Sequence, residues 1–249
     1  MVDTFSELGY AIVKAQGTGP WTLREALYDA CCEKLQEADR HIPGYIGRRS
    51  TDEWFDNFHD RELRGRELNN LRLHLQKTIQ PLVGPVLFDS FPAIGQLIGP
   101  DVVQQRGCNL VIAQPGDSER APTHRDAPLN SKFEVICWTP MNDAHDTKSM
   151  RVLNLAQTKV ALDTLRAEGY PAYKEYAAET GLAVEVPFGS ALIFWAGLVH
   201  SIPINQTHET RWTIHHRFKN FWAPYGEKGS GYFTGLHLSP VTQIGLGAA

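Results

Sequence analysis

The chain has 249 residues, of which 42% are hydrophobic and 21% charged, which is ample for the core of one large β domain. Its formal net charge is -4 and its isoelectric point about 6.2. This balance excludes a globally basic surface for nucleic acid or for an anionic membrane.

No segment points to a membrane or an export route. The longest apolar run, 191–199, is too short to span a bilayer, and the first ten residues lack the basic and apolar regions of a signal peptide. The four cysteines show no C-x-x-C spacing, so reduced buried thiols are expected. The sequence therefore predicts a cytoplasmic protein with no membrane partner.

The first hundred residues are predicted to be mainly helical after one strand. A short alternating run at 9–15 predicts an opening strand, and 22–40 carries apolar residues at helical spacing. The segment 66–99 also predicts helix, with an interruption near Pro81 and Pro85 because proline lacks a backbone N–H.

Residues 41–66 show no clean periodicity. The charged and aromatic stretch 52–67 is interpreted as a solvated surface, with part of a substrate lid as the alternative. The segment 158–180 predicts a helix or an irregular insertion.

The sequence pattern changes at residue 102, where short runs of β-branched or aromatic residues begin to alternate with turn residues. These predicted strands are 102–114, 133–141, 151–155, 183–186, 190–196 and 210–221. A helical front third followed by many short strands predicts a mainly β fold with flanking helices, built on a double-stranded β-helix or jelly roll.

We expect a single domain, because the chain has no repeat, low-complexity segment or linker. It comprises helical support over about 20–100, a β core over about 102–221, and a C-terminal tail or lid at 222–249.

A histidine and an aspartate lie two positions apart in the stretch "APTHRDAPLN". Because side chains alternate along a strand, His124 and Asp126 would point the same way at a strand end. Such a pair alone is more often part of a surface loop. A second strand-like run ends at His200, and Arg211 opens the next run eleven residues later. If both strands line one barrel, the three ligand types meet.

Two neutral imidazoles and one carboxylate on one face of an octahedral metal form the facial triad of non-haem Fe(II) oxygenases. The open positions accept a keto acid and dioxygen. A buried guanidinium such as that of Arg211 is a bidentate partner for the distal carboxylate of the keto acid, where lysine would offer only a point charge.

The sequence resembles the Fe(II)/2-oxoglutarate-dependent oxygenases, specifically the phytanoyl-CoA hydroxylase-like branch. The resemblance covers residues 9–15 and about 105–220. It follows the order His-x-Asp, a strand with Trp138, Gly-x-x-x-x-Phe, a distal histidine and an arginine.

The resemblance implies a set of functional residues and cofactors. Fe(II) is expected on His124, Asp126 and His200, with Arg211 binding 2-oxoglutarate and O2 as the oxidant. Trp138 and Asn109 are further candidates for contacts to 2-oxoglutarate. Halogenating relatives replace the carboxylate ligand by a small residue, so its presence here indicates a hydroxylase, desaturase or oxidative cyclase.

Two other readings remain. One is a cupin-like metalloenzyme without a keto-acid cosubstrate, which would usually have a third histidine or a glutamate near the first. The other is a non-catalytic jelly-roll binding module. Adjacent His215 and His216 must face opposite sides of a strand, so one is expected in the core or cavity and one on the surface.

The expected partner is a small polar substrate. A further similarity, to oxygenases of aminoglycoside and sugar-antibiotic pathways such as the orthoester-forming enzyme of hygromycin B biosynthesis, suggests a sugar-type secondary metabolite. Fold and site determine the reaction type and not the substrate.

Overall fold

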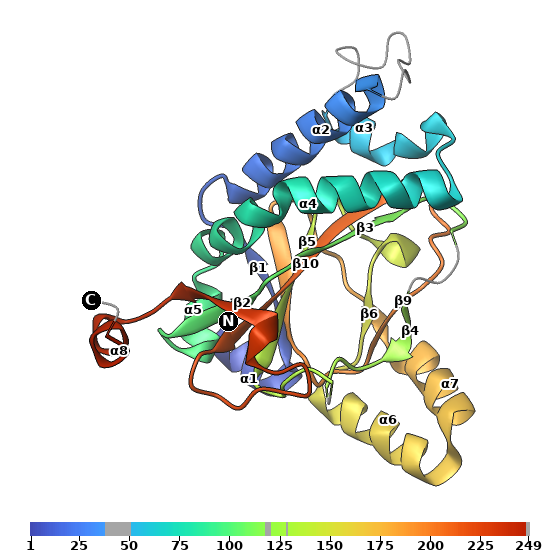
Figure 1. The fold of residues 1–249 in the computed structure, drawn as a ribbon. Helices are drawn as coiled ribbons and strands as arrows, with labels where there is room; N and C mark the ends of the chain where they lie inside the picture. Colours follow the sequence, from blue (N-terminus) through green and yellow to red (C-terminus); the bar gives the residue numbers. More distant parts are fainter. Residues whose placement is uncertain (38–50, 118–120, 128, 248–249) are drawn as a thin grey trace.

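The protein is a sandwich of two antiparallel sheets with helices on one side and at one end (Figure 1). The computed structural model describes residues 1–37, 51–117, 121–127 and 129–247. The fold predicted from the sequence, a jelly roll with flanking helices, is confirmed.

The large sheet has the order β1 (Tyr10–Lys14), β8 (Ser190–Trp195), β5 (Glu134–Pro140), β10 (Arg211–Asn220), β2 (Val102–Gln105) and β11 (Phe233–His237), and β3 (Asn109–Ala113) also pairs with β10. The small sheet has the order β4 (Ala121–His124), β9 (His200–Ile202), β6 (Arg151–Val152) and β7 (Leu182–Ala183). The helices are α1 (Val2–Leu8), α2 (Gly19–Glu37), α3 (Thr51–Asp56), α4 (Gly65–Ser90), α5 (Ala93–Ile98), α6 (Leu155–Glu168), α7 (Tyr170–Thr180) and α8 (Pro240–Gly245), with 3-10 turns η1 (Phe58–Arg61), η2 (Asp146–Lys148) and η3 (Ser230–Tyr232).

Helix α4 runs across the outer face of the large sheet, with α2 beside it (Figure 1). It buries a stripe at helical spacing that includes Leu75, Ile79 and Val83. The predicted interruption at Pro81 and Pro85 is wrong, since the helix continues through both. Both prolines lie on the exposed side, where water can hydrate the carbonyls that lose an N–H partner.

The strand β10 divides the molecule into two interiors. Trp212, Ile214 and Phe218 face the helices and belong to the main core. Since side chains alternate along a strand, Arg211 and the other odd-numbered residues of β10 face the small sheet. The outer face of β10 is thus mostly apolar, although His216 also lies on it, and the inner face is polar.

In the stretch 52–67 most charged residues are exposed, as predicted, but the aromatic residues are not part of that solvated surface. Trp54, Phe55 and Phe58 are fully buried and surround Trp212, with ring centroids 4.7 to 6.0 Å away. The charged residues around them masked this cluster in the sequence, because the burial of α3 follows no long helical period.

Several other elements differ from the predicted ones. The run 102–114 forms two strands, β2 and β3, and not one. The segment 158–180 is helical, which was one of the two predicted alternatives, and lies in α6 and α7. The last three residues of the predicted helix 22–40 lie outside the described residues. Part of the expected C-terminal tail or lid instead pairs with β2 as the edge strand β11. None of the helices in the described ranges is long and apolar enough to cross a membrane.

Candidate metal centre

The pairing of two short strands brings the predicted ligands together. In the small sheet β4 lies antiparallel to β9, and His124 is directly opposite His200. Their rings are 4.3 Å apart between centroids, and Asp126 follows two residues after the first histidine. The ligand atoms of the three side chains all lie within 4.8 Å of one another. Among the described residues, these three form the one group of histidine, cysteine, aspartate or glutamate side chains placed to hold a metal ion.

Backbone carbonyls orient both imidazoles. Nδ1 of His124 lies 2.7 Å from the carbonyl oxygen of Pro122, and Nδ1 of His200 lies 3.0 Å from that of Leu198. A carbonyl only accepts, so each Nδ1 carries the proton and each Nε2 presents its lone pair. This is how metal-binding histidines are held in the correct tautomer.

The electrostatics of the site favour the ligand forms of these groups. Burial lowers the pKa of His200 to about 4, so its imidazole is neutral at pH 7. Burial alone would raise the pKa of Asp126, but the charge of Arg217, the two histidines and a hydrogen bond from Arg217 together lower it. The site therefore offers a neutral imidazole at His200 and a carboxylate whose ionised form is favoured.

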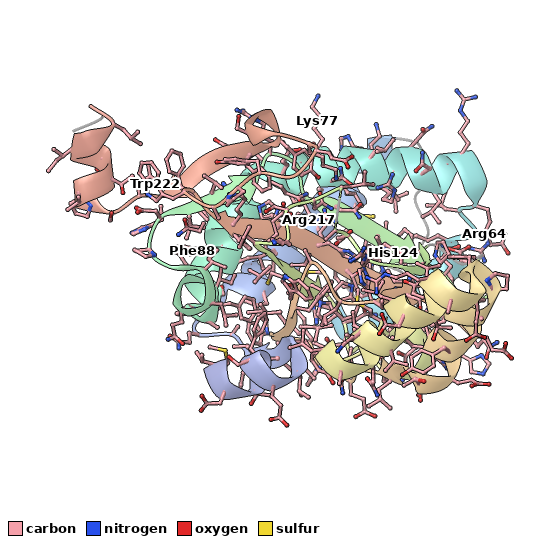
Figure 2. All side chains as sticks on the ribbon, turned by 90° about the horizontal axis from the view of Figure 1, so that it is seen from below. Arg64, Lys77, Phe88, His124, Arg217 and Trp222 are labelled. Carbon is pink, nitrogen blue, oxygen red and sulfur yellow. The ribbon has the colours of Figure 1, made fainter. Side chains whose placement is uncertain are left out.

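The second arginine of β10 contacts the carboxylate ligand directly. Arg217 Nη2 lies 2.9 Å from Asp126 Oδ1, and Arg217 Nη1 donates to Gln105 Oε1 at 3.1 Å. Figure 2 shows Arg217 in the middle of the molecule on β10, with His124 toward the α6–α7 hairpin. Sequence reasoning missed Arg217, although its position six residues after Arg211 places it on the same strand face.

A cavity of about 130 Å³ lies beside the three ligands, between the two sheets. Besides the triad it is lined by Asn109, Val111, Ala121, Ile136, Met150, Phe194, Ile202, His215 and Arg217. Its polar side comes from β3 and β10, and its apolar side from β5, β8 and the small sheet. The predicted candidate Asn109 thus lies in the cavity.

His215 is the cavity-facing member of the histidine pair. Burial lowers its pKa to about 3, with smaller contributions from Arg217 and Arg211, so it is a neutral hydrogen-bonding group. His216 faces the other side and is also buried, with Nε2 2.9 Å from Gln104 Oε1. The expectation that one of the two is on the surface is wrong, because α4 covers the outer face of β10.

Arg211 and Trp138 are fully buried on the same inner face, but neither lines the cavity. Trp138 is opposite His215 in the β5–β10 ladder, and their ring centroids are 6.2 Å apart. Arg211 lies four residues from His215 on β10 and interacts with it electrostatically. The structure therefore brings the triad and Asn109 together and leaves Arg211 and Trp138 outside the cavity lining, where both interact with His215.

Comparison with known proteins bears on the fold. No protein-family model matches the chain, and no curated protein matches its sequence. Among solved structures, ThoJ in complex with nickel, described as a non-heme monooxygenase, superposes with a TM-score of 0.55 at 15% identity over 95% of this chain and 83% of that chain. The chain therefore has the fold of ThoJ.

Two further solved structures are similar to this chain. AviO1 from Streptomyces viridochromogenes Tue57 gives a TM-score of 0.51 at 16% identity, over 90% of this chain and 95% of that chain. HygX from Streptomyces hygroscopicus, with nickel and 2-oxoglutarate bound, gives a TM-score of 0.47 at 12% identity, over 89% of this chain and 86% of that chain. The resemblance predicted from the sequence is confirmed for the fold, and the roles of residues rest on the geometry of the site.

Proposed function

We propose that this chain is a non-haem Fe(II)- and 2-oxoglutarate-dependent oxygenase. It would use O2 to hydroxylate a small polar substrate or close a ring in it, with release of succinate and CO2. The observation that carries the proposal is the convergence of one nitrogen from each of two imidazoles and one carboxylate oxygen within 4.8 Å inside a jelly roll. The proposed location is the cytoplasm, where its four free cysteines would stay reduced.

The donor set fits Fe(II). Two imidazoles and one carboxylate leave adjacent positions of an octahedral ion open, which a fully coordinated structural site does not do. The hydrogen bond from Arg217 to Asp126 supports a fixed carboxylate orientation, since outer partners of this kind orient metal ligands. His124, Asp126 and His200 are the residues that would hold the ion.

Binding of 2-oxoglutarate would extend the cavity along the inner face of the large sheet to Arg211 and Trp138, which are buried outside its lining. Arg211 is fully buried there and supplies a planar cation for the distal carboxylate. The indole N–H of Trp138 is buried and has no hydrogen-bond partner among the described residues, which costs about 1–3 kcal/mol. An oxygen of a bound dicarboxylate would accept that hydrogen bond, and Asn109 offers a further donor in the cavity.

When bound, Fe(II) with 2-oxoglutarate and O2 supplies the oxidising chemistry. The residues of this chain would bind the ion and the keto acid and keep water away from them. The triad would hold the ion, and Arg211 would orient the keto acid. Phe194, Ile136 and Met150 line the apolar side of the cavity and exclude bulk water. The polar cavity groups, His215 among them, favour a small polar substrate, for which we propose a sugar or aminoglycoside-type secondary metabolite.

The proposal competes with two others. A cupin-like metalloenzyme would bind metal without needing a keto acid, and a non-catalytic module would bind no metal at this site. The metal group in the described residues contains neither a third histidine nor a glutamate, and a buried arginine has no role in a cupin-like mechanism.

Turnover of 2-oxoglutarate tests the function. We expect succinate formation that requires both Fe(II) and O2, is absent in His124→Ala, and is stimulated by a compound from a panel of sugars and aminocyclitols. Arg166→Ala, a change at an exposed ion pair on α6, serves as the control and should leave the rate unchanged. Metal binding without succinate would refute the oxygenase, and no stimulation across the panel would refute the substrate class.

A further inference from the structure

The backbone around Arg211 is held by the side chain of Asn142. The amide Nδ2 of Asn142 donates to the carbonyl oxygen of Thr210 at 2.7 Å, and its Oδ1 accepts from the backbone N–H of Trp212 at 3.2 Å. One buried amide thus bonds to the residue before Arg211 and to the residue after it.

This contact begins where the β5–β10 ladder ends. The last paired residues are Pro140 and Thr213, and the last backbone bond runs from Met141 N–H to Trp212 O at 2.9 Å. Beyond Met141 the chain leaves the sheet. The amide of Asn142 has the same donor and acceptor as a peptide unit, so it extends the ladder by one step and covers the first residue of β10.

A charged pair orients the amide in turn. Nδ2 of Asn142 also donates to Asp56 Oδ1 at 2.7 Å, which uses its second hydrogen. The same carboxylate oxygen accepts from Nζ of Lys148 at 3.0 Å, and this fully buried ammonium also donates to Glu209. With one carboxylate oxygen accepting from both groups, the amide has one orientation that satisfies all its bonds.

The end of helix α3 also bonds to this part of the chain. The carbonyl oxygen of Asp56 accepts from the N–H of Thr210 at 2.7 Å. On the opposite edge, Arg211 is paired with Ala113 of β3, whose carbonyl oxygen accepts from Asn205 Nδ2 at 3.1 Å. The start of β10 is therefore fixed from both edges, although it follows an irregular loop.

We propose that Asn142 is a positioning residue that sets the affinity of this protein for the distal carboxylate of its keto acid, acting through the backbone of Arg211. The proposal rests on the proposed function, in which Arg211 binds that carboxylate. A bidentate contact requires the planar guanidinium to be placed within a fraction of an ångström, and this depends on the backbone that carries it. Asp56 and Lys148 act one step further out, by orienting the amide of Asn142.

The test compares two keto acids under anaerobic conditions. 2-Oxoglutarate has the distal carboxylate and 2-oxobutyrate lacks it, while both chelate Fe(II) through the same keto-acid group. Dissociation constants for Fe(II) and for each keto acid, read from the visible band of the chelate, are measured for the wild type, Arg211→Ala, Asn142→Ala and Asn220→Ala. Asn220 is the matched control, since its side chain bonds two backbone groups, Ile98 O and Trp222 N–H, at the other end of β10.

We expect Asn142→Ala to raise the dissociation constant of 2-oxoglutarate about tenfold or more. This is the size typical for removing a group that orients a ligand-binding side chain. Its affinities for Fe(II) and 2-oxobutyrate should stay within about twofold of the wild type, as should every affinity of Asn220→Ala. If Asn142→Ala instead weakens the binding of both keto acids equally, the effect is a general loss of structure and the proposal is overturned. An unchanged preference for 2-oxoglutarate in Asn142→Ala would also overturn it.

If the proposed function itself is wrong, the measured affinities follow a different pattern. A wild type without the band, or an Arg211→Ala variant that still prefers 2-oxoglutarate, removes the role of Arg211 and the positioning role with it. A wild type with the band and a sensitive Arg211→Ala, beside an insensitive Asn142→Ala, removes only the positioning role. If Asn142→Ala does not fold, Lys148→Met takes its place, with a smaller shift expected in the same direction.

Discussion

Replacement of Arg217 by methionine should make the stability of the protein depend strongly on bound metal. The guanidinium and Asp126 are largely buried, with side chains 15% and 12% exposed, and 2.9 Å separates their charged atoms. Removing one partner of a buried pair costs about 3–5 kcal/mol because the other charge stays uncompensated. Since Asp126 keeps some contact with solvent, we expect about 3 kcal/mol for the metal-free protein.

A divalent ion on the triad would replace the lost positive charge. The metal-free variant should melt about 6–12 °C below the wild type, from roughly 2–4 °C per kcal/mol for a domain of this size. With saturating Co(II) the difference should fall to about half or less, because the ion neutralises Asp126. The hydrogen bond from Arg217 to Gln105 is lost in both states and accounts for the remainder.

Differential scanning calorimetry of both proteins, with EDTA and with Co(II), measures these differences. Arg166→Met is the control, because its partner Asp163 is solvent-exposed and the pair contributes little in either state. An equal loss for Arg217→Met with and without metal would show that its interaction with Asp126 is not linked to metal binding, and would refute the reasoning.

Three further predictions concern the triad, the core and the C-terminal segment. His200→Ala should lose Fe(II) binding, measured by equilibrium dialysis, while its melting temperature in EDTA stays within a few degrees of the wild type; retained binding would exclude this residue as a ligand. Ile193→Ala, fully buried in β8, should lower the free energy of unfolding in urea by about 2–5 kcal/mol without changing Fe(II) affinity. The backbone N–H of Ser239, with smaller hydrogen-bond contributions from Thr242 and Trp222, lowers the pKa of Asp101 to about 2, so this contact is complete above pH ~4 and is lost as the pH falls toward 2. The protection of residues 237–247 from hydrogen exchange, relative to the intrinsic rate at each pH, should fall as the pH drops over that range, and Asp101→Asn should show reduced protection already at pH 7; full protection in the variant would contradict this.

The triad was predictable because each of its members follows from local pattern. Two residues separated by one share a strand face, which gives His124 and Asp126, and an apolar run that ends in a polar residue gives His200. The cross-strand register of the two histidines is not a local property. It depends on how β4 meets β9 in the folded sandwich.

Features that depend on which face of a helix or strand is covered by a distant part of the chain were not predictable from one segment alone. Pro81 and Pro85 look like helix breaks until the exposed face of α4 is known. The inward-facing Arg217 lies among alternating polar residues, and its partner Asp126 is far away in sequence. The aromatic cluster around Trp212 likewise requires the contact between α3 and β10.

The most direct test of the central claim is a titration of the metal-free protein with Fe(II) and then 2-oxoglutarate in the absence of oxygen. We predict a weak visible band that requires both additions, is absent in His200→Ala and needs far more 2-oxoglutarate in Arg211→Ala. Iron binding without the band would favour a cupin-like enzyme, and no iron binding at all would contradict the metal centre itself.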